Sequence, residues 1–365
     1  MLSLRILFVC SGAEQGRDGV GDYTSRLASE LSRQGQSTAL LAINDRHLES
    51  ESSATKDNLR LSIKMPWEKR IQTARDFVCN FRPDVLSLQF VGYGFNSQGL
   101  PLGLASRLEK LAKPGRWHLM LHELWIEPRG GWRFRALSQL QKILITRLCR
   151  ELRPGAVHTS NSYYQQKLQA SGISCEILPL FGNIPVVSTD SKRDPTEWVF
   201  VFFGSLRRGW EPEPLLSRIE HARSASGKSR CRFVSIGRLG EYGETLWSRM
   251  ENAGYQNFVF QKRGELPIDD ISRELHSADF GIAVSPLHLL GKSGAVAAMR
   301  EHGLPVVVNR ICEGISARIP EALPSVILLN DRFAENLALA KKSPCHEGLP
   351  DVAEAFLRSL AFVEK

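Results

Sequence analysis

Short apolar runs alternate with longer amphipathic stretches, and this alternation constrains the fold more than any other feature of the chain. The opening predicts a strand at Arg5–Cys10, a helix at about Val20–Arg33 that ends at Gly35, and a strand at Thr38–Ile43. Strands that alternate with helices form parallel sheets covered by helices on both faces. We therefore expect an α/β, doubly wound architecture.

The same alternation continues through the first half of the chain. Helices are predicted at Trp67–Phe81, Leu102–Lys113, Trp132–Arg150 and Ser162–Ala170, and strands at Asp84–Phe90, Trp117–Leu121 and Ala156–Thr159. The pattern lapses around Pro179–Glu197 and restarts at Trp198–Phe203. Further strands are predicted near Cys231–Ile236, Asn257–Gln261, Phe280–Ser285, Pro305–Val308 and Val326–Leu329, with helices such as Ile268–His276 and Gly294–His302.

The chain is long enough for two domains. Its 365 residues exceed the ~250–300 at which a single core stops growing. We expect an N-terminal Rossmann-like domain at 1–180, a linker at 181–196 and a C-terminal Rossmann-like domain at 197–345. The last segment, 346–365, contains an amphipathic helix at Val352–Phe362, for which packing back on the first domain is one option.

Composition favours a soluble globular enzyme, with 42% hydrophobic and 24% charged residues. The first apolar run is shorter than a signal sequence requires, and no stretch approaches the ~18 apolar residues of a spanning helix. A cytoplasmic protein is expected, with peripheral contact at the cytoplasmic membrane face as an option. The seven cysteines lack a C-x-x-C pair, so they are expected to be reduced and mostly buried.

The formal net charge of +8 suits an anionic partner such as a nucleotide phosphate, an anionic lipid or a nucleic acid. No recognised nucleic-acid-binding module is visible, so we expect no nucleic-acid partner. The segment Pro128–Arg135 and the helix after it interleave aromatic and basic residues. This pattern suits a membrane surface and a lipid-linked acceptor, or equally a solvated helix face.

Ligands of doubly wound sheets bind at the carboxyl ends of the strands, so the loop after the first strand is the first candidate site. It contains Gly19 and Gly21 at the start of a helix, where free N–H groups favour an anion. Their spacing differs from the G-x-G-x-x-G of dinucleotide enzymes, which weakens an NAD-binding hypothesis. Ordinary turn chemistry explains these glycines about as well.

His122 and Glu123 form a second candidate, because they directly follow the strand Trp117–Leu121. A histidine at this place suits a sugar hydroxyl or a phosphate, although an isolated histidine is more often a satisfied structural side chain.

In the second half, Ser205, Arg207 and Arg208 follow the strand that ends at Phe203. Two guanidinium groups there would neutralise a diphosphate, while the alternative is a pair of ordinary surface arginines.

A fourth candidate precedes the helix Gly294–His302. Lys292, Ser293 and Gly294 at this helix start form a plausible phosphate cradle. The step Gly291-Lys292-Ser293 imitates the end of a P-loop, but the glycine that the motif requires upstream is missing, so an ATPase is a poor interpretation.

Several loose motifs occur in a fixed order. They are Gly19–Tyr23, Arg82–Phe90, His122–Trp125, Thr159–Ser162 and Gly303–Val307. Together they resemble the family 4 retaining glycosyltransferases of the GT-B fold, over about Leu4–Asn309.

The resemblance implies two Rossmann-like domains that face a central cleft and a nucleoside-diphosphate sugar held mainly by the C-terminal domain. It implies retaining transfer to a glycan or lipid-linked acceptor, as in cell-surface polysaccharide or glycoconjugate synthesis, with no cofactor and no essential metal. By the same resemblance, Gly19 and Gly21 lie by the donor phosphates, His122 contacts the transferring sugar, and Arg208 binds the diphosphate.

Two departures from the family pattern stand out. The family's spaced pair of glutamates would flank Leu290–Ala298, and apolar or small residues stand at Leu290, Ala297 and Ala298 instead. The arginine expected after the glycine of the diphosphate turn is Ser205. We expect Lys292 to supply the missing charge.

The expected catalytic residues are His122, Arg208 and Lys292. The donor is assigned to Gly19, Gly21, Ser205, Arg207, Ser293 and Gly294, and the acceptor or a supporting role to Asp22 and Glu123. A catalytically inactive relative that binds a glycan or a protein is the alternative that the missing glutamates suggest.

Overall fold

The computed structural model describes residues 3–113, 116–128, 130–188, 194–206, 208–312 and 325–361. The chain divides into two compact units. Unit 1 comprises the chain up to Pro179 together with the segment from Leu349, and unit 2 comprises Leu180–Gly348.

Unit 1 is built on an eight-stranded sheet in the order β3-β4-β2-β1-β5-β6-β7-β8. All neighbouring strands are parallel except β3 and β4. The strands are β1 (Arg5–Cys10), β2 (Ser37–Asp45), β3 (Ser52–Ala54), β4 (Asn58–Ser62), β5 (Val85–Phe90), β6 (Trp117–Leu121), β7 (Ala156–Thr159) and β8 (Glu176–Ile177). Every residue of the central strands β5 and β6 is buried, which explains their nearly continuous apolar sequence.

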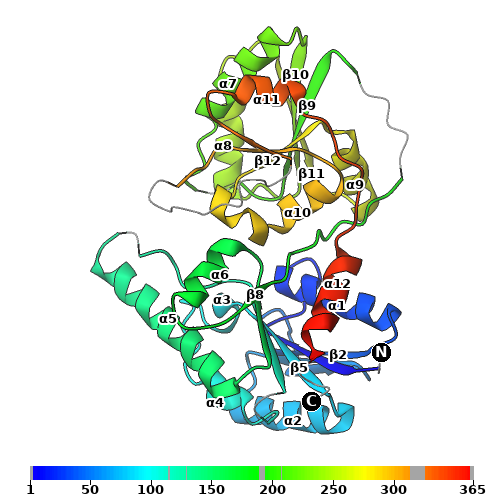
Figure 1. Cartoon of the computed structure of the whole chain (residues 1–365), viewed down its shortest axis with the longest axis vertical. Coiled ribbons are helices and arrows are strands. Elements are labelled where there is room, and N and C mark those ends of the chain that lie inside the picture. Colours follow the sequence, from blue (N-terminus) through cyan, green and yellow to red (C-terminus); the bar gives the residue numbers. More distant parts are fainter. Residues whose placement is uncertain are drawn as a thin grey trace. The chain divides into compact units, whose positions relative to one another are not determined.

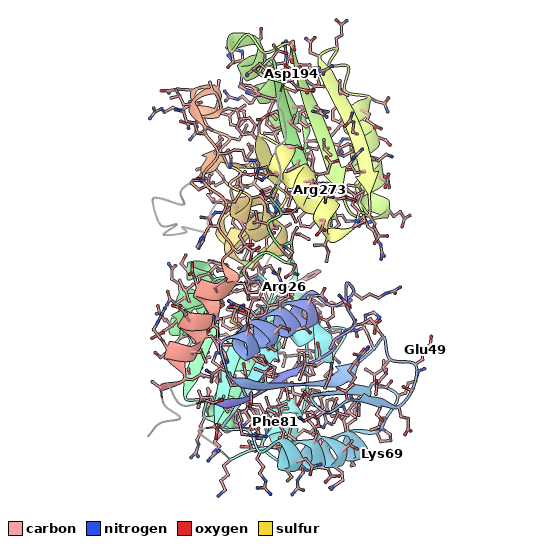
Figure 2. The ribbon with its side chains drawn as sticks, turned by 90° about the vertical axis from the view of Figure 1, so that its right-hand side faces the viewer. Arg26, Glu49, Lys69, Phe81, Asp194 and Arg273 are labelled. Atoms are coloured by element: carbon pink, nitrogen blue, oxygen red, sulfur yellow. The ribbon has the colours of Figure 1, made fainter. Side chains whose placement is uncertain are left out.

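Helices cover both faces of this sheet. In Figure 2, Arg26 on α1 and Lys69 on α2 mark helical layers on opposite faces. The helices of unit 1 in chain order are α1 (Gly19–Arg33), α2 (Trp67–Phe81), α3 (Gly92–Phe95), α4 (Leu104–Leu108), α5 (Trp132–Leu152) and α6 (Ser162–Gln169).

The last helix, α12 (Leu349–Ser359), packs on unit 1 beside α1 (Figure 1). The ring of Phe356 stacks on Phe8 of β1 with centroids 5.7 Å apart, and it meets His118 of β6 edge-on at 4.8 Å. Phe356 is fully buried, so α12 contributes directly to the core of unit 1.

Unit 2 contains a six-stranded, wholly parallel sheet in the order β11-β10-β9-β12-β13-β14. Its strands are β9 (Glu197–Phe203), β10 (Arg230–Ile236), β11 (Phe258–Gly264), β12 (Phe280–Ala283), β13 (Val306–Val308) and β14 (Val326–Leu328). Its helices are α7 (Glu213–Ala225), α8 (Glu241–Glu251), α9 (Ile268–Ser277), α10 (Gly294–Glu301) and α11 (Phe333–Leu339), with a 3₁₀ turn, η1, at Leu287–Lys292.

Four phenylalanines on neighbouring strands form a row through the core of unit 2. Phe260, Phe233, Phe200 and Phe280 lie on β11, β10, β9 and β12, and the Cα register pairs each with its neighbour. Their rings stack with centroid distances of 4.9, 5.2 and 5.0 Å. Stacked rings of this kind add to the stabilisation that burial alone supplies.

Most predicted elements are confirmed, some with identical bounds, as at Trp67–Phe81 and Ala156–Thr159. The predicted helix Leu102–Lys113 is wrong in length, since α4 spans only Leu104–Leu108 after Gly103, which has φ +69°. The cysteines are unpaired as expected, but Cys79 and Cys345 are exposed and only three are buried. Within the described ranges, no helix is both long and apolar enough to cross a membrane.

Candidate functional site

His122 lies at the carboxyl edge of the sheet in unit 1, directly after β6. Its backbone N–H donates to the carbonyl of Phe90 at the end of β5 (3.0 Å), so it continues the strand pairing. Its ring nitrogen Nε2 lies 2.9 Å from Oε1 of Gln89. The ring of Tyr23 from α1 packs edge-on against the imidazole, with centroids 5.0 Å apart. The predicted site residue is thus held between β5 and α1.

The imidazole of His122 is neutral over the whole physiological range. It is only 7% exposed, and burial lowers its pKa from the ordinary value of 6.5 to about 3. A neutral imidazole carries one donor and one acceptor, so it suits a hydrogen bond with a hydroxyl better than attraction of a phosphate.

The loop before α1 already supplies its own anion. The carboxylate of Asp18 caps the helix and accepts hydrogen bonds from the N–H groups of Val20 (3.0 Å) and Gly21 (3.1 Å). The expectation that free N–H groups here attract a phosphate therefore does not hold for these two groups. A Cβ on Gly21 would lie 2.7 Å from the carbonyl oxygen of Gly12, so close backbone packing explains this glycine, whereas Gly19 is exposed.

Two acidic candidates lie near this loop. Asp22 accepts from the N–H of Gly16 at 3.0 Å, and burial raises its pKa despite that bond. Glu123 follows His122 and is half-buried. Asp22, on the helix that follows β1, and His122, directly after β6, thus both belong to connections at the carboxyl edge of the sheet in unit 1.

In unit 2, the turn after β9 contains two glycines with positive φ. Gly204 has φ +86° and Gly209 has φ +74°, a backbone region that favours glycine. Ser205 and Arg208, which lie between them, are exposed, and the guanidinium of Arg208 lies 5.6 Å from the ring centre of Tyr242. The predicted partner Arg207 lies outside the described residues.

The loop after β12 ends at the start of α10. Ser293 caps this helix, with its hydroxyl accepting from the N–H of Val296 at 3.3 Å. Lys292 and Gly294 on either side are half-buried. Because β9 and β12 are adjacent parallel strands, this loop and the Arg208 turn leave the same edge of the sheet.

Arg310 is a residue of this edge that the sequence motifs did not reveal. It follows β13, the next strand in the sheet, and its carbonyl accepts from the N–H of Leu287 at 2.9 Å. A Cβ placed on Gly209 would lie 3.8 Å from Nη2 of Arg310. Asn309 holds this loop, since its amide oxygen accepts from Nε1 of Trp210 at 2.7 Å. Only the strand order brings these cationic loops together.

Of the positions where the resemblance would place glutamates, Leu290 and Ala298 are part of the core and Ala297 is half-buried. Leu290 is 5% exposed and Ala298 is fully buried. A Cβ on Gly182 would lie 2.7 Å from Cα of Ala298, so this chain segment passes directly over the helix there.

Among the residues that the structure describes, no group of three or more histidine, cysteine, aspartate or glutamate side chains could hold a metal ion.

No protein-family model and no curated protein matches the chain in sequence, whereas many solved structures match its fold. One is UDP-GlcNAc 2-epimerase from Methanocaldococcus jannaschii (TM-score 0.56, 11% identity, covering 98% of this chain and 100% of that chain). A second is a glycosyltransferase from Rickettsia africae (TM-score 0.54, 14% identity, covering 99% of this chain and 93% of that chain). A third is the lipopolysaccharide outer core galactosyltransferase WaaB (TM-score 0.53, 14% identity, covering 99% of this chain and 99% of that chain). These likenesses confirm the predicted fold class, GT-B with two parallel-sheet α/β domains.

Proposed function

We propose that the chain is a glycosyltransferase that moves a sugar from a nucleoside-diphosphate sugar to a glycan or lipid-linked acceptor. One observation carries this proposal: three cations follow three adjacent parallel strands of unit 2. Arg208 follows β9, Lys292 follows β12, and Arg310 follows β13. Guanidinium and ammonium groups at the carboxyl edge of such a sheet suit a diphosphate.

The similar solved structures support this assignment. They include the glycosyltransferase from Rickettsia africae, WaaB and an α-glucosyltransferase in complex with UDP and DNA. For this chain we assign the donor to unit 2, with Arg208 and Lys292 acting on the diphosphate and Ser205, Arg207, Ser293 and Gly294 as further contacts. Gly19 and Gly21 stay proposed donor contacts of unit 1, although Asp18 reduces the case for a phosphate there.

The proposed chemistry is retaining transfer without an essential metal or a cofactor. The cations stabilise the negative charge that grows on the diphosphate as the glycosidic bond breaks. The acceptor hydroxyl then attacks the sugar on the same face, transferring its proton to the leaving phosphate. Neutral His122 holds a hydroxyl of the transferring sugar, and Asp22 and Glu123 act on the acceptor or support it. We propose that this occurs in the cytoplasm, in polysaccharide or glycoconjugate synthesis.

The catalytically inactive alternative is favoured by one observation, the buried apolar side chains of Leu290 and Ala298. A protein of this kind would bind a glycan or another protein without turnover of a nucleotide sugar.

The test measures thermal stabilisation and turnover with a panel of UDP-, GDP- and ADP-sugars, because a ligand of the folded state raises its melting temperature. Stabilisation by one diphosphate class, lost in Arg208→Ala and Lys292→Ala, supports the proposal. Lys228→Ala is the matched control, since Lys228 donates to the carbonyl of Pro195 beside Asp194 at the amino end of β9 (Figure 2). Stabilisation without turnover favours the inactive alternative. If no donor of the panel stabilises the protein or is turned over, the proposed transferase is contradicted and the inactive alternative is favoured over it.

We also propose that α5 contacts an anionic membrane surface that presents a lipid-linked acceptor. Trp132 and Ile143 are 73% and 57% exposed, and they share one helical face with Arg150. Leu140, one turn away, is 50% exposed. Exposed aromatic and aliphatic side chains among arginines suit the interface of anionic lipids.

Co-sedimentation with vesicles tests this contact. Binding is expected to phosphatidylglycerol-containing vesicles and not to phosphatidylcholine alone, and Ile143→Ser should weaken it. Ile63→Ser is the matched control, because Ile63 is 48% exposed elsewhere on unit 1. Equal loss in both variants, or no binding by the intact protein, would contradict the contact.

A further inference from the structure

A continuous row of polar side chains runs from His122 through the interior of unit 1. Nε2 of His122 lies 2.9 Å from Oε1 of Gln89, whose Nε2 donates to Oγ of Ser87 at 2.7 Å. That oxygen lies 2.8 Å from Nδ1 of His118, and Nε2 of His118 lies 2.8 Å from Nδ1 of His158. No member is more than 7% exposed, so the row is sealed from water.

The parallel sheet explains how these residues meet. Ser87 and Gln89 are two residues apart on β5 and therefore point to the same face. Ser87 pairs in register with His118 of β6, and His158 belongs to the next strand, β7. Phe356 of α12 covers the ring of His118. The row thus crosses three adjacent strands beneath a helix.

All donors in this row point in one direction. The amide oxygen of Gln89 can only accept, so His122 carries its proton on Nε2. The Gln89 amide donates to Ser87, and among the printed contacts of the Ser87 hydroxyl Nδ1 of His118 is the acceptor for its own proton, so Ser87 donates to His118. A neutral His118 then has its proton on Nε2 and donates to Nδ1 of His158. The three histidines are therefore all Nε2–H tautomers.

The outer end of the row favours this direction. Nε2 of His158 lies 3.9 Å from Oε2 of Glu176 on β8. A carboxylate accepts and cannot donate, so it attracts an N–H and repels a nitrogen lone pair. The opposite direction, which a rotated Gln89 amide would require, would place that lone pair towards Glu176 and give three Nδ1–H tautomers.

We propose that Gln89, Ser87, His118 and His158 are positioning residues that hold His122 as its Nε2–H tautomer. The Nδ1 of His122 is then fixed as an acceptor, and the group that it takes is a hydroxyl donor, such as a sugar hydroxyl. Burial lowers the pKa of all three histidines, which keeps them neutral and makes the choice of tautomer meaningful. The role in sugar binding rests on the proposed glycosyltransferase function; the tautomer does not.

Nitrogen-15 NMR of the histidine rings in the full-length protein tests the tautomers directly. The expected result is one tautomer, Nε2–H, at His118, His122 and His158, assigned through single histidine variants. Nδ1–H at all three positions would overturn the proposed direction, and rapid averaging between tautomers at His122 would overturn the proposed positioning.

Two substitutions at Gln89 separate positioning from general stability. Gln89→Met removes both polar groups at similar volume, so His122 should become a mixture of tautomers. Gln89→Glu keeps an oxygen acceptor for His122, and its buried carboxyl group should stay protonated and donate to Ser87 in place of the amide, so His122 and His118 should both stay Nε2–H. Leu88→Met is the matched control, because Leu88 is fully buried between Ser87 and Gln89 and points to the opposite face.

Kinetics with whichever nucleotide sugar the protein uses then tests the role in binding. Gln89→Met should lower kcat/KM by about tenfold, the value of one hydrogen bond, while Gln89→Glu restores most of it and Leu88→Met has no effect. An equal loss in Gln89→Met and Leu88→Met would overturn the role in binding. If no nucleotide sugar is used at all, the proposed function fails, and the tautomer result still decides the structural claim.

Discussion

The two units use the same architecture and fill the middle of their sheets with opposite chemistry. In unit 2, the row across β11, β10, β9 and β12 consists of four stacked phenylalanines. In unit 1, the row across β5, β6 and β7 consists of hydrogen-bonded Gln89, Ser87, His118 and His158. An aromatic row stabilises its unit without fixing the position of any proton. The polar row fixes which ring nitrogen of each histidine carries the proton. Unit 1 therefore orients a neutral imidazole, and unit 2 places its charge at the sheet edge.

The starts of helices α1 and α10 show the same contrast. In unit 1, the carboxylate of Asp18 caps α1, and in unit 2, the neutral hydroxyl of Ser293 caps α10. A carboxylate at a helix start repels a phosphate, while a hydroxyl leaves the positive end of the helix available to one. The contrast supports the assignment of the diphosphate to unit 2.

Acid is expected to have the largest effect: a fall in pH should destabilise unit 1 more than unit 2. Burial lowers the pKa of His118, His122 and His158 in unit 1 and that of His302 in unit 2. Below the ordinary histidine pKa the unfolded chain binds protons that the folded unit does not, so stability is lost as the pH falls. From pH 7 to 5 His122 alone, with its pKa lowered to about 3, should cost about 2 kcal/mol, and His118 and His158 should add to this loss.

Hydrogen exchange at both pH values, corrected for intrinsic exchange, measures this loss on peptides from β5 and β9. Exchange from β5 should accelerate more than exchange from β9. Equal acceleration in the two strands would mean that the buried histidines do not distinguish the units.

Removal of one ring from the aromatic row should cost the next largest amount. Phe200 stacks on both Phe233 and Phe280 and is fully buried. Phe200→Ala should therefore lower the free energy of unfolding of unit 2 by about 3–5 kcal/mol, measured in urea. Phe200→Leu, which keeps most of the apolar volume, should cost clearly less. A loss below about 1 kcal/mol in Phe200→Ala would show that the row is not a main source of stability.

Substitutions at the two helix caps should have the smallest effect on stability. They also test the electrostatic difference between the starts of α1 and α10. Asp18→Ala should cost about 1 kcal/mol, and Asp18→Ser should recover most of it because a hydroxyl also caps a helix. Ser293→Ala should cost a similar amount and also weaken binding of a nucleoside diphosphate, whereas Asp18→Ala should not weaken it. Tighter binding in Asp18→Ala, with no change in Ser293→Ala, would place the phosphate in unit 1.

The sequence was sufficient to predict the fold class and most strands, because buried parallel strands are nearly continuous apolar runs. It did not predict β3 and β4, whose short sequences Ser52–Ala54 and Asn58–Ser62 are largely polar. Helices α7 and α8 were not individually located either. Edge strands and half-exposed helices give weak periodic signals, so tertiary contacts decide them.

The candidate site was predictable only in part. His122 was found because it follows a strand, but its partner Gln89 and the row behind it depend on strand register, which a single sequence does not contain. Arg310 belongs to the cationic edge because β13 lies beside β12, and it has no motif of its own. The cap at Asp18 could have been found, since an aspartate before a glycine at a helix start is a common signal.

Calorimetric titration of UDP, GDP and ADP into the intact protein, Arg208→Ala, Arg310→Ala and the double variant tests most directly whether the cationic edge of unit 2 holds a diphosphate. Each arginine makes charge-assisted bonds in this assignment, so each single variant should weaken binding of the preferred nucleotide by about tenfold or more. The losses should not be additive, because both groups act on one diphosphate. Unchanged affinity in all three variants, with a nucleotide that does bind, would contradict the assignment.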